Sequence, residues 1–250
     1  MTLPPIGKVM PIMVRKRLIK ILAVAFGLAA AGLVPAHATI TTTLVVTDSA
    51  GDSVTIADGG IGSYSGHGPG YGADSNPNAN TVTWVGTIGN WYLNVDTGVL
   101  DGNPTAAPNL DVSFLDDEST GPGTLTITFT ATGLGPLPAD TAAPQLSFGG
   151  TTDNGEVTYN ALINSSETTI GPLTGPSFSG DKTGAEVGGL LSTFTMVQSV
   201  VIDHTTGGST SGDARFTIIP EPTTMLAGAL LLLPFGLSTL RPRGIGRRSA

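Results

Sequence analysis

The sequence predicts an all-β fold, an antiparallel β-sandwich of the jelly-roll kind, flanked by two apolar terminal segments. Three observations lead to this prediction. The chain has 250 residues, and its 35 Gly and 18 Pro are more chain breakers than a helical bundle or coiled coil tolerates. Between the ends, apolar residues recur with a period of two rather than about 3.6. Turn sequences rich in Gly, Asn and Asp separate these alternating runs.

The N-terminus has the three parts of a secretory signal peptide. A basic stretch precedes an uncharged apolar run at 21–34, and the small residues Ala36 and Ala38 follow it with the spacing of a cleavage site. The apolar run is shorter than the about 20 residues that a membrane-spanning helix needs. We therefore expect residues 1–38 to be a signal peptide, removed so that Thr39 becomes the first residue. A permanent N-terminal anchor is the alternative.

Alternating residues place the strands of the domain. The most regular strand is expected at 123–131, where Leu125 and Ile127 belong to an apolar series that alternates with threonines. Two glycine-rich stretches, 63–80 and 171–189, are expected to be long loops. Further strands are expected at 41–47, 53–57, 81–88, 91–95, 110–115, 157–163, 192–204 and 215–219.

The expected mature domain, residues 39–219, is strongly acidic. It holds 18 of the 19 acidic residues and only two basic ones, Lys182 and Arg215, so its formal charge is −16. A surface of this charge repels phosphate groups, which excludes nucleic acid as a partner of the folded domain. The chain contains no Cys, which is compatible with export to an oxidising compartment.

Residues 220–250 end the chain in three parts: a Pro-Glu-Pro motif, an uncharged apolar run at 223–240, and an arginine-rich tail. The apolar run, as a helix, is just long enough to cross a bilayer core of about 30 Å. Basic residues behind such a helix stay in the cytoplasm and stop translocation, so the preceding domain would face outward. The tail contains four of them: Arg241, Arg243, Arg247 and Arg248.

This order of parts resembles the PEP-CTERM sorting signal of Gram-negative bacteria, a family whose members also carry a signal peptide. The resemblance covers residues 220–248 and implies that Pro220, Glu221 and Pro222 are recognised by an exosortase, a membrane-embedded transpeptidase-like enzyme. It further implies a transient inner-membrane anchor, transfer to the envelope surface or extracellular matrix, and an association with exopolysaccharide and biofilm. Pro234 interrupts the apolar run, which departs from an unbroken helix. A C-terminal anchor that is never cut is the alternative.

Motifs of familiar catalytic sites are missing from the sequence. Two histidines follow the expected signal peptide, His67 in a glycine-rich loop and His204 at the end of an expected strand, and both are expected to be surface or turn residues. No G-x-S-x-G context singles out a nucleophilic serine. We therefore expect a protein that is not an enzyme and needs no cofactor.

Two small groups of residues are candidates for binding. Trp84, Trp91 and Tyr92 lie close together in the sequence, and exposed aromatic rings can stack on sugar rings; the alternative is that these rings fill the core. Asp116 and Glu118 lie two residues apart at the end of an expected strand, so their carboxylates share a face and are candidate ligands for Ca²⁺.

The sequence thus predicts an exported, exosortase-processed, non-enzymatic protein of the cell surface or extracellular matrix. Its expected partners are the Sec machinery, signal peptidase, an exosortase, the inner membrane before processing, and exopolysaccharide. A lectin-like carbohydrate-binding module is the alternative, and it depends on the aromatic group alone.

Overall fold

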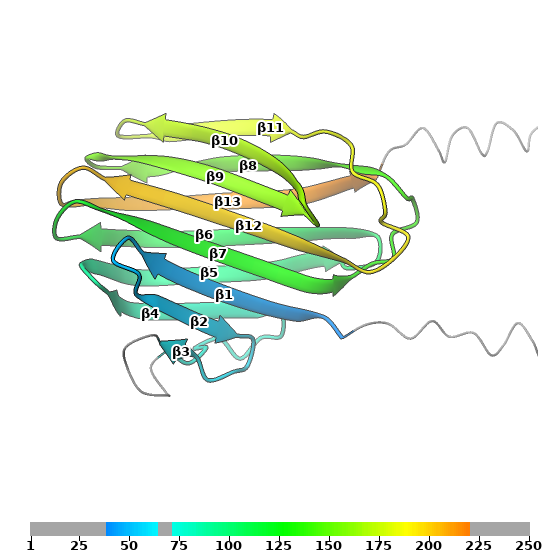
Figure 1. Cartoon of the computed structure of the whole chain (residues 1–250), viewed down its shortest axis with the longest axis horizontal. Helices are drawn as coiled ribbons and strands as arrows, with labels where there is room; N and C mark the ends of the chain where they lie inside the picture. The colour runs from blue at the N-terminus through cyan, green and yellow to red at the C-terminus, as the bar shows by residue number, and fades with distance from the viewer. Residues whose placement is uncertain (1–38, 65–71, 221–250) are drawn as a thin grey trace, which may run out of the picture. The chain divides into compact units, whose positions relative to one another are not determined.

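The computed structural model describes residues 39–64 and 72–220, and the regular elements in these residues are all β-strands (Figure 1). One sheet has seven strands in the order β10 (Ser166–Thr174), β9 (Gly155–Ile163), β12 (Phe194–His204), β7 (Gly123–Leu134), β1 (Thr41–Asp48), β2 (Ser53–Ala57) and β3 (Ser63–Tyr64). The other has six, in the order β11 (Phe178–Thr183), β8 (Ala142–Thr152), β13 (Gly208–Pro220), β6 (Ala107–Ser119), β5 (Trp91–Asn103) and β4 (Thr81–Ile88). The all-β, antiparallel prediction is confirmed.

Several predicted features lie outside the described residues. These are the signal peptide with Ala36 and Ala38, the histidine His67, and the sorting segment beyond Pro220. Within the described residues, no helix is long and apolar enough to cross a membrane.

The alternating strand at 123–131 is the centre of the seven-stranded sheet. It forms most of β7, which pairs with β1 on one side and β12 on the other, so that Leu44 lies opposite Phe129 and Ile127 opposite Val200. The apolar members of these strands point to the other sheet and are fully buried, whereas the threonines between them remain partly exposed. Burying each large apolar side chain contributes about 1.5–3 kcal/mol, which is why the alternation decides which face turns inward.

The predicted strand pattern is wrong in several places. The expected loop at 63–80 contains β3, and β10 was not expected. The stretch at 171–189 was expected to be a loop, but it contains the end of β10 and all of β11. β8 was not expected, because two of its inward residues, Ala142 and Pro144, are small or chain-breaking and give a weak apolar signal. β13 begins at Gly208, well before the expected residue 215, because its first residues are Gly, Ser and Thr.

Irregularities lie along neighbouring strands of the six-stranded sheet. The register shifts between Trp84 and Gly86 in β4, and between Thr210 and Gly212 in β13. In β6, which lies between β13 and β5, Asp116 has a positive φ of 52°. Such a β-bulge adds one residue to one strand of a pair. Beyond the bulge, the side chains of that strand therefore point to the opposite faces from those that a strict period of two predicts.

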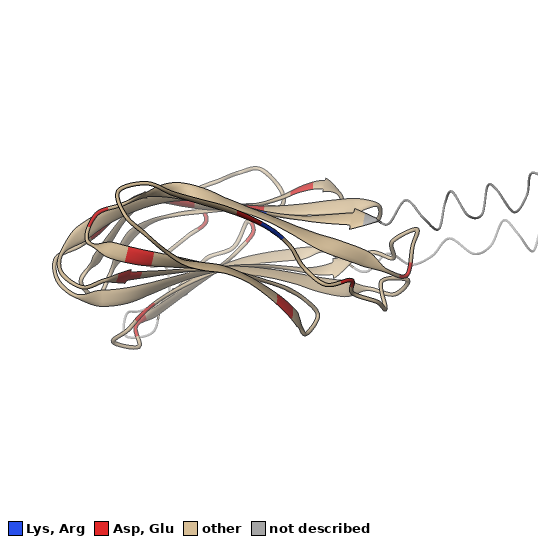
Figure 2. Cartoon of the chain, turned by 90° about the horizontal axis from the view of Figure 1, so that it is seen from above, with Lys and Arg blue, Asp and Glu red and all other residues tan. Residues whose placement is uncertain are grey.

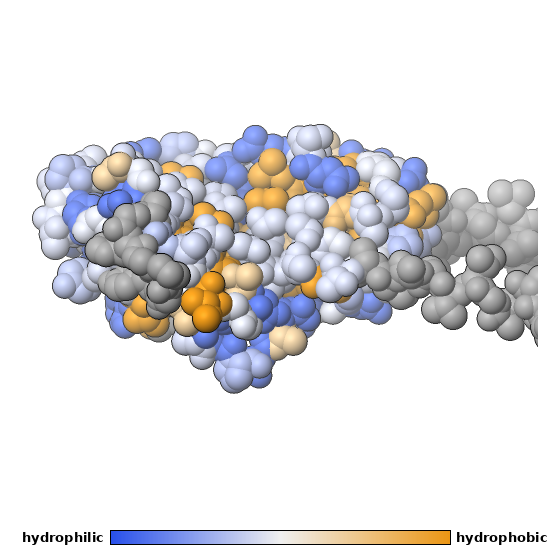
Figure 3. Space-filling view, turned by 60° about the horizontal axis from the view of Figure 1, so that its bottom comes forward, coloured by the Kyte–Doolittle hydropathy of each residue, from blue (hydrophilic) through white to orange (hydrophobic). Residues whose placement is uncertain are grey.

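The charge of the domain is spread over strands and turns. Figure 2 shows acidic positions at many places on the ribbon and few basic ones. On the face shown in Figure 3, hydrophobic residues occur as separate small groups within a surface of mostly weakly polar residues. The first residues of β1 and the last of β13 lie at the same end of the two sheets (Figure 1).

Candidate functional site

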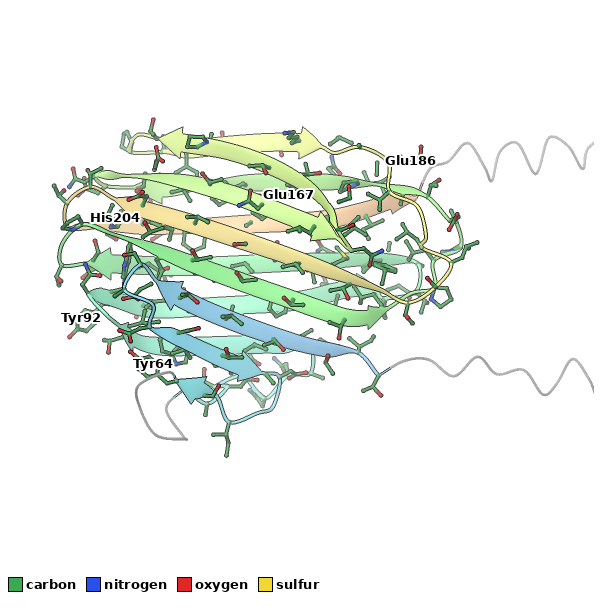
Figure 4. All side chains as sticks on the ribbon, viewed as in Figure 1. Tyr64, Tyr92, Glu167, Glu186 and His204 are labelled. Atoms are coloured by element: carbon green, nitrogen blue, oxygen red, sulfur yellow. The ribbon has the colours of Figure 1, made fainter. Side chains whose placement is uncertain are left out.

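The two tryptophans proposed for glycan stacking are core residues. Trp84 is 2% exposed and Trp91 is fully buried, so neither indole can stack on a ligand at the surface. Their burial follows from the alternation of β4 and β5, which turns both side chains toward the seven-stranded sheet. Tyr92, the next residue after Trp91, points the opposite way and is 61% exposed (Figure 4). Of the three aromatic candidates, Tyr92 alone is available to a ligand.

Tyr92 borders an open hollow of about 420 Å³ on the outer face of the six-stranded sheet. Tyr92 pairs with Thr87 of β4 on one side and with Glu118 of β6 on the other, so these three residues form a row across the strands. The hollow is lined by Val85, Gly86, Thr87, Tyr92, Leu93, Asn94, Asp116 and Glu118. The structure therefore brings together Tyr92, Asp116 and Glu118, which the sequence offered as two unrelated candidates.

The bulge in β6 decides how the acidic residues are divided between the two faces. Asp116 and Glu118 are exposed on the outer face, as expected, and Asp117 between them is fully buried. The Asp116 backbone N–H donates to Ser211 Oγ (2.8 Å), and that hydroxyl donates back to Asp116 Oδ1 (3.1 Å). Within residues 39–64 and 72–220 no three or more His, Cys, Asp or Glu side chains group as metal ligands. Calcium at Asp116 and Glu118 stays a prediction.

A pair of carboxyl groups lies behind this hollow, inside the core. Asp96 of β5 and Asp117 of β6 are both fully buried, and as two carboxylates their four oxygens would have no hydrogen-bond partner. The two Lys and Arg residues of the described ranges are engaged elsewhere: Lys182 Nζ donates to Thr169 O, and Arg215 Nε donates to Asn109 Oδ1. A proton held between Asp96 and Asp117 gives each carboxyl group one hydrogen-bond partner, because a protonated carboxyl can donate to a carboxylate.

Burial is the main influence on the acidity of this pair. It raises the pKa of Asp96 to about 7, although the hydrogen bond with Asp117 acts in the opposite direction. Burial, the charge and hydrogen bond of Asp96, and the charge of Asp116 all raise the pKa of Asp117 well above its ordinary value. The pair therefore holds at least one proton at neutral pH, since two buried like charges cannot both ionise without a large cost in free energy.

His204 is buried, so the expectation of a surface or turn histidine is wrong for this residue. His204 is 1% exposed, and the centroid of its ring lies 4.8 Å from that of Trp91. Its Nδ1 atom lies 2.7 Å from Ser119 Oγ, and its Nε2 atom lies 2.8 Å from Thr210 Oγ1. Burial lowers its pKa, against the opposing charges of Asp203 and Asp153. A neutral imidazole between two hydroxyls joins β12 of one sheet to β6 and β13 of the other.

The Ser119 and His204 contact has the distance of a nucleophile and a base, but its surroundings differ from those of a hydrolase. Ser119 is 7% exposed and lies opposite Trp91 in the pairing of β6 with β5. The second ring nitrogen of His204 faces the Thr210 hydroxyl rather than a carboxylate. Thr210 Oγ1 continues to Thr152 Oγ1 at 2.8 Å. This chain of hydroxyls ties strands together inside the domain.

The described domain thus belongs to the antiparallel all-β proteins, with a hollow on its outer face and polar groups in its core. No family model matches the chain, and no curated protein or solved structure is significantly similar to it.

Proposed function

We propose that this chain is an exported, non-enzymatic protein of the cell surface or extracellular matrix, cut from the inner membrane by an exosortase and associated with exopolysaccharide in a biofilm. One observation supports this best: both proposed cleavages fall at the edges of the folded domain. β1 begins at Thr41, just after the proposed first residue Thr39, and β13 ends at Pro220, which pairs with Ala142. Cuts after Ala38 and within the Pro-Glu-Pro motif beyond Pro220 leave every strand whole.

The pairing of strands that are distant in sequence supports a jelly-roll-like sandwich as the finer description of the fold. β12 pairs with β7, and β13 pairs with β6, so that both sheets are built from segments on either side of β8 to β11. Such crossings between sheets are typical of jelly rolls.

Replacing Glu221 with Ala is expected to stop C-terminal processing without stopping membrane insertion. The apolar run and the arginines suffice for insertion, whereas the Pro-Glu-Pro motif is needed by the processing enzyme. The intact mass of the protein from membrane and medium fractions of its native host reads both cleavages at once. The full-length, membrane-bound form should accumulate.

Glu186→Ala, at an exposed residue of the domain, is the matched control and should be processed like the wild type. If wild-type protein retains Arg247 and Arg248 at steady state, the sorting proposal is wrong and the segment is a permanent anchor.

Carbohydrate binding is the second candidate function, and the exposed Tyr92 ring in the hollow is the observation that favours it. Replacing Tyr92 with Ala should abolish binding to the host's purified exopolysaccharide, because an aromatic face provides the apolar surface for a sugar ring. Tyr92→Phe keeps the ring and should retain binding. Equal retention of all three proteins on immobilised polysaccharide would rule out this site, and no retention of any would leave the protein without a lectin function.

A further inference from the structure

The hollow beside Tyr92 combines an apolar surface with hydrogen-bonding groups. Two exposed hydrophobic side chains line it: Val85 is 55% exposed and Tyr92 61%. The Thr87 hydroxyl and the Asn94 amide lie in the same lining. A ligand with one apolar face and several hydroxyl groups, such as a pyranose ring, matches this lining better than a purely apolar group.

The second property of the hollow is its charge. Glu118 lies directly across from Tyr92, and Asp116 is held at the bulge by its two hydrogen bonds with Ser211. Among residues 39–64 and 72–220, no basic side chain lines the hollow, and Lys182 belongs to β11, at the opposite edge of the sheet from β4. The two carboxylates therefore attract a cation and repel an acidic sugar.

We propose that this hollow binds an amino sugar with a free, protonated amine, within a polysaccharide chain, with the sugar face on Tyr92 and the ammonium group on Glu118 and Asp116. The proposal rests on the carbohydrate-binding candidate above and names its ligand class. A cation beside an aromatic ring gains from the ring's negative face as well as from the carboxylates. An N-acetylated sugar has the same ring but no charge, and a uronic acid has the opposite charge.

A matched pair of ligands tests the charge separately from the sugar. Titration calorimetry of the protein recovered from its host, at low ionic strength and about pH 6, compares a glucosamine oligosaccharide with its N-acetylated counterpart of equal length. Since the amine is protonated at this pH, we expect the glucosamine chain to bind at least about tenfold more tightly, and the difference to shrink in high salt.

Single substitutions show which residues cause the preference for the free amine. Glu118→Gln should remove most of the preference for the free amine, and Tyr92→Ala should weaken binding of both oligosaccharides. Glu167→Gln changes an exposed carboxylate of β10 in the other sheet and should change neither (Figure 4). A thermal melt of each variant shows whether it is folded.

The outcomes separate this inference from the function on which it rests. Equal binding of both oligosaccharides, lost in Tyr92→Ala, would overturn the amino-sugar inference and leave carbohydrate binding standing. No binding of either would overturn both. Equally tight binding of a lysine oligomer, or a preference that Glu167→Gln reduces as much as Glu118→Gln, would mean a general attraction of cations to an acidic surface, and would also overturn the inference.

Discussion

At about pH 8, replacing Asp96 with Asn is expected to stabilise the domain by a few kcal/mol. The reason is that the wild-type pair then carries a fully buried negative charge, and each unit by which burial raises a pKa corresponds to about 1.4 kcal/mol. Asn has the same shape and its amide can donate to Asp117. At about pH 4, where the wild-type pair is protonated, the two proteins should differ little.

The direction of the pH dependence follows from the raised pKa values. A carboxyl group with a folded-state pKa of about 7 and an ordinary value of 3.8 holds its proton in the folded protein and loses it in the unfolded chain between these values. The wild-type domain therefore loses stability as the pH rises from about 4 to 7. Asp111, whose pKa is raised to about 6 mainly by burial and also by Asp213, acts in the same direction.

His204 acts in the opposite direction. Its folded-state pKa lies below 6.5, so the unfolded chain takes up more protons, and stability is lost as the pH falls below that value. The pKa values of three carboxyl groups are raised, and the pKa of one imidazole is lowered. We therefore expect the highest stability in mildly acidic solution. Urea unfolding at a series of pH values from about 4 to 8 measures this, with Glu167→Gln as the surface control. A wild-type free energy of unfolding that rises over this range would contradict the shared-proton pair.

Replacing Trp84 with Ala is expected to cost about 3–5 kcal/mol of unfolding free energy, because it leaves a large cavity between the two sheets. Trp84 is 2% exposed, and its ring lies so close to Gly86 that a Cβ on that residue would come within 2.5 Å of it. Tyr92→Ala is the matched comparison at an exposed aromatic residue and should change stability by no more than about 0.5 kcal/mol. Urea unfolding of the three proteins measures both effects.

The different effects of the Trp84 and Tyr92 substitutions on stability decide which residue is used to test carbohydrate binding. A loss of binding in a Trp84 variant reports unfolding, so only Tyr92 can separate a ligand site from the core. A Trp84→Ala protein as stable as the wild type would mean that the ring does not fill the space between the sheets.

The regular strands were predictable because the alternation of apolar and polar residues in each strand shows which of its faces is buried. In β7 the series Leu125, Ile127 and Phe129 requires one buried face, and the structure buries all three. β8 and β11 were missed because small or polar residues can occupy a strand when a neighbouring strand supplies the hydrogen bonds, as β13 does for β8. Their place in the sheet depends on pairing partners far away in the sequence.

The candidate site was only partly predictable for the same reason. Sequence spacing indicated that Asp116 and Glu118 share a face, but it could not show that Tyr92 lies opposite Glu118, which depends on the register between β5 and β6. It also could not assign Asp96 to the core, because the expected strand ended at residue 95 and a charged residue usually marks the surface.

The sequence by itself determined the all-β class, the acidity of the domain, and the expectation of export and sorting, because composition, period and terminal segments are local properties of the chain. Only the tertiary structure decided which aromatic ring is exposed, that His204 is buried between hydroxyls, and that Asp96 meets Asp117. Each of these depends on a bulge or a strand register, and a shift of one residue reverses the face on which every following side chain lies.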